Sequence, residues 1–165
     1  MPPLLTHARA PRRWLEVKLI ELGMVNNPSY KIAFVMDKTS MFKVTSLVSG
    51  AQKEHSVKPL QIIWSKYTQY SSANTIHIDD LSRNFALNPY NGVKVSGYYR
   101  KKRAAARDME LVTLATYLGK LSSEVTDFTT VDHRRWREVA AGSEGWRGVE
   151  RAEDGKKDGE SEKKE

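Results

Sequence analysis

The chain has 165 residues, contains no cysteine and carries a formal net charge of +7. Its length predicts a single domain, and the lack of cysteine excludes disulfides and thiolate chemistry. No apolar run approaches the ~18 residues of a membrane span, so we expect no membrane partner. The first residues also lack the long apolar segment of a secretory signal.

The charge is unevenly distributed along the chain. Residues 150–165 include seven acids and five bases, which leaves this segment at −2 and residues 1–149 at +9. From residue 142 onward the chain is rich in Gly, Glu, Lys and Asp, which predicts a disordered charged tail over 142–165. The basic remainder favours anionic partners such as phosphorylated peptides, nucleic acid or acidic proteins.

The N-terminal region begins without a regular pattern. Residues 1–11 include three prolines and show no periodicity, so we expect an irregular N-terminus there. Leucines then recur at positions 15, 19 and 22, which predicts a helix over 12–22 that ends at Gly23.

The later elements are expected from apolar periodicity and turn residues. They are strands over 30–36, 41–48 and 75–78, a turn or loop over 49–54, helices over 59–70, 107–121 and 132–141, and a short β-like run within 92–99. Strands interspersed with helices predict an α/β fold.

Two adjacent carboxylates, Asp79 and Asp80, follow the expected strand at residues 75–78. They cannot both face the core, so at least one should project beyond the strand end, where a carboxylate can hold Mg²⁺. The same pair could instead begin a helix, with one Asp as its N-cap. The residues alone favour this second, structural interpretation.

Lys58 is the next candidate, because it lies just before Pro59 at the expected start of a helix. A lysine there could offset the charge that develops in phosphoryl transfer, or it could simply be solvated. Arg83 and Asn84 could contact phosphate or orient Asp80, or could cap and solvate the loop.

Two groups of basic residues are candidate anion-binding surfaces. The run from Arg100 to Arg103, with Arg107, could be a nuclear localisation signal, an anion patch or a solvated face. Arg134, Arg135 and Arg137 surround Trp136 and could serve nucleic acid, although no complete binding motif accompanies them.

Several motifs together resemble one known family. They are the string Asp79-Asp80-x-x-Arg83-Asn84-Phe85-x-x-Asn88-Pro89-x-Asn91-Gly92 and the string Val57-Lys58-Pro59-Leu60. In this order they resemble the haloacid-dehalogenase-like phosphatases, and within them the branch that dephosphorylates the RNA polymerase II C-terminal domain, in particular its members with a ubiquitin-like domain. The resemblance covers about residues 13–138.

The resemblance carries expectations about fold and chemistry. It implies a partial haloacid-dehalogenase-like (Rossmann-like) domain with C-terminal helices, and residues 12–141 would be its C-terminal half. It implies Lys58 as a catalytic residue, Asp79 and Asp80 as ligands of Mg²⁺, and Arg83 and Asn84 as substrate-binding residues. It further implies a nuclear protein serine/threonine phosphatase whose substrates are phosphoproteins, such as the RNA polymerase II C-terminal domain or proteasome subunits.

One part of the family pattern is missing from these residues. Family members act through an Asp-x-Asp-x-Thr or Asp-x-Asp-x-Val string, whose first Asp is the nucleophile and whose second is the acid/base. The 165 residues contain no Asp-x-Asp, and Thr6 is a poor match for the family's second motif. The strands that would carry these motifs are central in a parallel sheet, so we expect exposed apolar edges and marginal stability or dependence on a partner.

Two functions therefore remain open. One is a Mg²⁺-dependent phosphatase represented by a truncated or inactive form. The alternative is a non-enzymatic module that holds phosphoprotein or nucleic acid on a basic surface.

Overall fold

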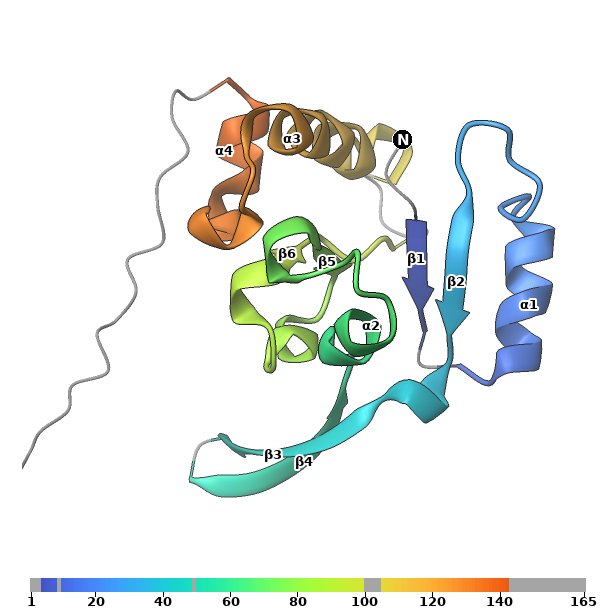
Figure 1. The fold of residues 1–165 in the computed structure, drawn as a ribbon, viewed down its shortest axis with the longest axis vertical. Coiled ribbons are helices and arrows are strands. Elements are labelled where there is room, and N and C mark those ends of the chain that lie inside the picture. The colour runs from blue at the N-terminus through green and yellow to red at the C-terminus, as the bar shows by residue number, and fades with distance from the viewer. Residues whose placement is uncertain (1–3, 9, 49, 100–104, 143–165) are drawn as a thin grey trace, which may run out of the picture.

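The computed structural model describes residues 4–8, 10–48, 50–99 and 105–142. Helices and small sheets are mixed in it, which confirms the predicted α/β character (Figure 1). Besides short 3₁₀ turns, its elements are β1 (Leu4–His7), α1 (Arg12–Glu21), β2 (Ile32–Met36), β3 (Phe42–Val48), β4 (Ala51–Val57), α2 (Gln61–Lys66), β5 (His77–Asp79), β6 (Gly92–Lys94), α3 (Glu110–Glu124) and α4 (Trp136–Ala140).

The strands form three separate pairs in the described residues. β1 pairs with β2 and β5 pairs with β6, both in parallel, whereas β3 and β4 are antiparallel. The prediction of an irregular N-terminus is wrong for Leu4–His7, which pair with β2 up to Met36. This strand is short and flanked by prolines, so it leaves no periodic signal in the sequence.

Apolar residues of the parallel pairs remain partly open to solvent. Ile78 on β5 is 39% exposed and Val35 on β2 is 38% exposed. Residues of parallel strands are normally buried on both faces by covering elements. Their exposure agrees with the expectation that apolar parts of the sheet lack cover.

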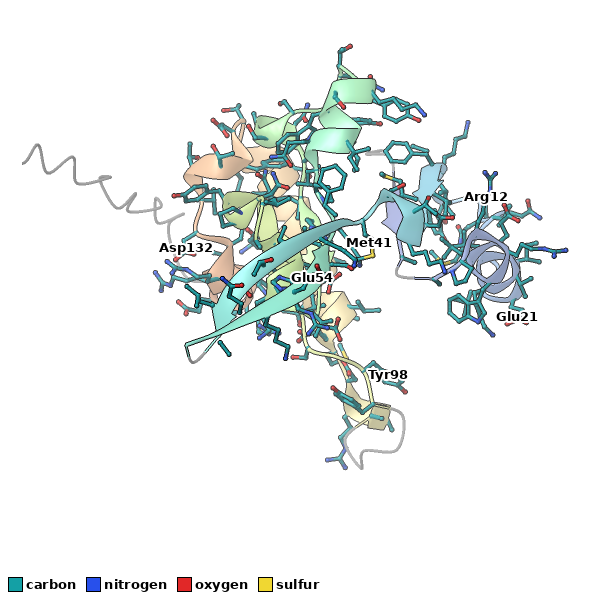
Figure 2. The ribbon with its side chains drawn as sticks, turned by 90° about the horizontal axis from the view of Figure 1, so that it is seen from below. Arg12, Glu21, Met41, Glu54, Tyr98 and Asp132 are labelled. Atoms are coloured by element: carbon teal, nitrogen blue, oxygen red, sulfur yellow. The ribbon has the colours of Figure 1, made fainter. Side chains whose placement is uncertain are left out.

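The helix predicted over residues 12–22 is confirmed as α1, which lies at one edge of the molecule (Figure 2). Leu15 and Leu19 are buried, but Leu22 is exposed because it already belongs to the cap. Gly23 adopts φ +64°, and the N–H of Met24 bonds to the carbonyl of Leu19 at 2.8 Å. This is a Schellman ending, which explains glycine at position 23.

β3 and β4 form a ribbon that extends away from the helices (Figure 1). Its ladder is continuous from Phe42 opposite Val57 to Val48 opposite Ala51. The prediction of a turn or loop over 49–54 is therefore wrong for residues 51–54, which are strand. The first four residues of β4 are all exposed, so their side chains are polar or small and show no apolar alternation.

The segment between α2 and β6 departs from its predicted bounds. The helix expected to reach residue 70 ends at Lys66, and the Tyr67 ring stacks on Phe34 of β2 with 4.6 Å between centroids. The strand expected over 75–78 is confirmed in type but lies at His77–Asp79, so Asp79 is its last residue.

The hydrophobic core lies where β6 meets α3 and α4. It contains Val93, Leu114, Tyr117, Leu121, Val131 and Trp136. The indole N–H of Trp136 donates to the carbonyl of Lys94 at 2.8 Å and so ties α4 to β6. The helix predicted over 107–121 is confirmed as α3, and that over 132–141 consists of a 3₁₀ turn followed by α4.

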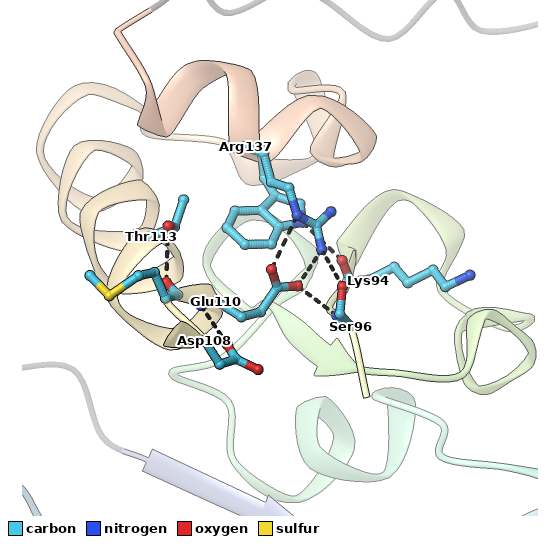
Figure 3. A network of polar contacts seen from close by, with 8 residues as sticks. Lys94, Ser96, Asp108, Glu110, Thr113 and Arg137 are labelled. Carbon is cyan, nitrogen blue, oxygen red and sulfur yellow. Dashed lines mark hydrogen bonds and ion pairs between the residues drawn. The ribbon is translucent and has the colours of Figure 1, made fainter. Parts of the chain in front are cut away.

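A polar network beside this core joins the same elements (Figure 3). Glu110, at the start of α3, accepts from the backbone N–H of Ser96 at 2.6 Å and pairs with the guanidinium of Arg137 on α4. Arg137 also donates to the Ser96 hydroxyl at 3.1 Å and lies over the Trp136 ring.

The predicted tail over 142–165 lies outside the described residues except for residue 142. The basic run from Arg100 to Arg103 also lies outside the described residues.

Candidate functional site

Lys58 is held between buried neighbours at the junction of β4 and α2. Val57 before it and Pro59 after it are almost inaccessible to solvent. The backbone N–H of Leu60 donates to the side-chain oxygen of Asn88 at 2.9 Å, which anchors the start of the helical turn. The backbone that carries Lys58 therefore has little freedom to move.

The Lys58 side chain reaches a carboxylate on the last residue of β5. Its ammonium donates to Oδ2 of Asp79 at 2.6 Å, although the two residues are 21 positions apart. Lys58 is 14% exposed and Asp79 is 7% exposed, so solvent screens this ion pair far less than a surface pair. The structure thus brings together two of the residues that the sequence singled out.

Asp79 has further partners that fix its charge and orientation. Oδ1 accepts from the backbone N–H of Leu81 at 2.9 Å, and Nε2 of His77 lies 3.8 Å from Oδ2. Burial alone would raise the pKa of Asp79, but His77, Lys58 and the Leu81 N–H together lower this pKa far below its ordinary value. Asp79 is therefore ionised throughout the physiological pH range.

Phe85 and Gly92 support the position of His77, which the sequence did not single out as a site residue. The ring of Phe85 meets the His77 ring edge to face, with 5.0 Å between centroids. A Cβ at Gly92 would lie 2.5 Å from Cγ of Phe85, so only glycine leaves room for this ring. Nδ1 of His77 is buried and has no hydrogen-bond partner among the described residues.

Asp80, Arg83 and Asn84 do not join the Lys58–Asp79 pair through any hydrogen bond or ion pair in the described part of the chain. Asp80 and Arg83 are exposed, and Asn84 is buried in a 3₁₀ turn. Asp80 points toward the backbone of Gly97, where an added Cβ would lie 3.2 Å from its Oδ2. Asp79 is buried and Asp80 is exposed, which confirms the expectation that the two adjacent acids do not both face the core.

The Asn-Pro and Asn-Gly dipeptides do more than form a turn. Asn88 holds Leu60, as described above, and the Asn91 amide donates to the carbonyls of Ser72 and Thr75 at 2.6 and 2.8 Å. Both asparagines are buried. They fix the segments that carry Lys58 and Asp79, a role that the sequence did not indicate.

Mg²⁺ favours several oxygen ligands and retains part of its water, and the acids of this site do not meet these needs. Among the described residues, no cluster of three or more His, Asp or Glu side chains could hold a metal ion. Asp79 has both oxygens engaged by protein donors, and Asp80 diverges from it. Asp79 and Asp80 therefore do not form a magnesium site by themselves.

The predicted arginine patch around Trp136 is largely neutralised by acids. Arg134 pairs with Asp132 through two nitrogens at 2.7 and 2.8 Å, Arg135 pairs with Glu138, and Arg137 pairs with Glu110. These contacts leave little free positive charge for a nucleic-acid backbone.

Residues 24–129, more than half of the chain, match the family described as NLI interacting factor-like phosphatase. The chain belongs to this phosphatase family. The match covers Lys58, Asp79 and the loop after β5. It confirms the family resemblance that the motifs indicated.

Relatives within the NLI interacting factor-like phosphatases extend this match. The Drosophila melanogaster protein named ubiquitin-like domain-containing CTD phosphatase 1 is 40% identical over 124 residues, which are 75% of this chain and 38% of the relative. Proteins of the same name from Danio rerio and Homo sapiens are 38% and 36% identical over 125 and 134 residues. The human match covers 81% of this chain and 41% of the relative. The chain thus spans about two fifths of the length of these curated relatives.

No helix in the described part of the structure is long and apolar enough to cross a membrane.

Proposed function

We propose that this chain carries the phosphate-binding side of a haloacid-dehalogenase-like protein phosphatase site. The observation that supports this most directly is the buried Lys58–Asp79 pair, which lies within the residues that match the family. Its substrates would be phosphoproteins in the nucleus. The name of the relatives favours a CTD substrate, and the sequence resemblance adds the RNA polymerase II C-terminal domain and proteasome subunits as candidates.

Each site residue has a role in this proposal. The Lys58 ammonium attracts a phosphate dianion and offsets the charge on its oxygens as the ester bond breaks. Asp79 holds the ammonium in place, and Asn88 holds the backbone turn that follows Lys58. Arg83 is exposed beside the same loop and would contact the substrate, whereas buried Asn84 would support the loop.

In this proposal Mg²⁺ would be bound by Asp80 together with residues outside this chain, and not by these 165 residues alone. The ion would supply electrostatic stabilisation of the transferred phosphoryl group. Asp80 is the exposed carboxylate of the pair and would be this chain's contribution to its ligands. The remaining ligands and the attacking carboxylate would come from an Asp-x-Asp segment, which these 165 residues lack.

The lack of that segment favours a second candidate function. Without an attacking carboxylate, the same site residues would hold a phosphorylated side chain and release it unchanged. The chain would then be a phosphoprotein-binding module. Both candidates require phosphate recognition by Lys58, and they differ only in whether turnover follows.

Phosphate recognition can be tested by titrating the full chain with O-phosphoserine and following backbone amide chemical shifts. We expect saturable shifts at residues near 58–60 and 79–81, lost in Lys58→Met. Lys43→Met is the matched control, because it removes an exposed lysine that pairs with Glu54 on the β3–β4 ribbon. Equal binding by both variants, or no saturable shifts in the unaltered chain, would overturn the proposal.

A further inference from the structure

The carboxylate of Asp79 already has a cation in contact with it. The Lys58 ammonium lies 2.6 Å from Oδ2 and donates a short, charge-assisted hydrogen bond to it. A divalent ion bound to the same oxygen would stand next to this ammonium, and the two like charges would repel each other. Lys58 therefore occupies the place that a cation needs.

The other approaches to Asp79 are also restricted. The Leu81 N–H points at Oδ1, and Nε2 of His77 faces Oδ2 at 3.8 Å. The side chain is only 7% exposed. The Leu81 N–H therefore leaves Oδ2 as the oxygen that a cation would contact, and the Lys58 ammonium is already in contact with it.

Asp80 cannot help to draw a metal ion to Asp79. Asp79 ends β5 and Asp80 follows it, with one side chain buried and the other exposed beside Gly97. A single ion bound by both residues would need an oxygen of Asp79 and an oxygen of Asp80 on the same side of the chain. The two adjacent acids therefore act separately.

We propose that Lys58 is the built-in counter-cation of Asp79 and closes this carboxylate to divalent metal ions. Asp79 is then a positioning residue for Lys58 rather than a metal ligand. Removing the ammonium creates a divalent-cation site at Asp79. The proposal concerns the same site as the proposed function, but it involves no phosphate, so the two can fail separately.

The test is a titration of the full chain with Mn²⁺ at pH 8, with free Mn²⁺ measured by electron paramagnetic resonance. We expect Asp79→Asn to leave Mn²⁺ affinity unchanged in the chain that retains Lys58. Lys58→Met should bind Mn²⁺ at least tenfold more tightly, and the gain should disappear in Lys58→Met/Asp79→Asn.

Two controls separate this effect from general electrostatics. Lys43→Met removes one positive charge from an exposed position, so it should not raise Mn²⁺ affinity tenfold. Asp80→Asn reports any binding at the neighbouring acid. A tenfold loss of Mn²⁺ affinity on Asp79→Asn alone would overturn the proposal, as would the absence of any gain in Lys58→Met. If Asp79→Asn folds poorly, the comparison of Lys58→Met with Lys43→Met still decides between the two outcomes.

Discussion

Lys58 and Asp79 form a largely buried ion pair that joins the turn after β4 to the end of β5. Removing one member of such a pair leaves the other charge buried and uncompensated. We therefore expect Asp79→Asn to lower the free energy of unfolding by about 2–4 kcal/mol, as measured by urea denaturation. The control is Glu54→Gln, which breaks the exposed Lys43–Glu54 pair and should leave the urea midpoint unchanged within error. Equal effects of the two changes would show that the pair is not buried in solution.

A second prediction concerns the contact between Gly92 and Phe85. Gly92→Ala places a methyl group 2.5 Å from Cγ of Phe85, so the ring that supports His77 must move. We expect a loss of about 1–3 kcal/mol in unfolding free energy. Gly119→Ala is the matched control, because its added Cβ meets no atom within 4 Å outside the adjoining helix backbone, and alanine favours the helix. It should be neutral or stabilising by up to about 1 kcal/mol. A neutral Gly92→Ala would contradict the described contact.

The buried His133 makes stability depend on pH. Its Nε2 donates to the carbonyl of Phe128 at 2.8 Å, and its Nδ1 then accepts from the Tyr117 hydroxyl. Burial lowers the pKa of His133 in the folded protein, against weaker opposing effects of the Phe128 bond and of Asp132. As the pH falls, the unfolded chain therefore binds a proton first, at a pKa of about 6.5.

The direction in which the unfolding free energy changes with pH follows from this order of protonation. The stabilising contribution of neutral His133 is complete above the unfolded pKa. It is lost as the pH falls from that value to the lower folded pKa. Unfolding free energies between pH 8 and pH 5 should decline more steeply for the unaltered chain than for His133→Gln. Parallel curves would contradict this prediction, since the other histidines contribute equally to both.

The elements that the sequence predicted well are those with a clear apolar period. α1 has leucines at helical spacing and Gly23 at its end, and α3 buries Leu114 and Leu121, which follow the same spacing. Both were found near their expected bounds. β4 was missed because its exposed residues show no alternation, and β1 because it is four residues long.

The site was predictable only in part, for a related reason. Charged residues in the family's motifs pointed to Lys58 and Asp79 before their contact was known. The sequence could not show that the Lys58 ammonium contacts Oδ2 of Asp79, the oxygen through which this side chain would bind a metal ion. The supports provided by Asn88, Asn91 and Phe85 depend on tertiary contacts between distant segments, and such contacts have no periodic signature.

The central claim is that these residues hold the phosphate-binding side of a phosphatase site without an attacking carboxylate. The most direct test is hydrolysis of p-nitrophenyl phosphate with Mg²⁺ by the full chain, compared with Lys58→Ala and Asp80→Asn. Phosphate monoesters hydrolyse extremely slowly without catalysis, and electrostatic help alone leaves the bond without a nucleophile. We expect all three proteins to remain near the uncatalysed rate. Strong turnover by the unaltered chain that both substitutions abolish would contradict the account, because it would require a nucleophile within these 165 residues.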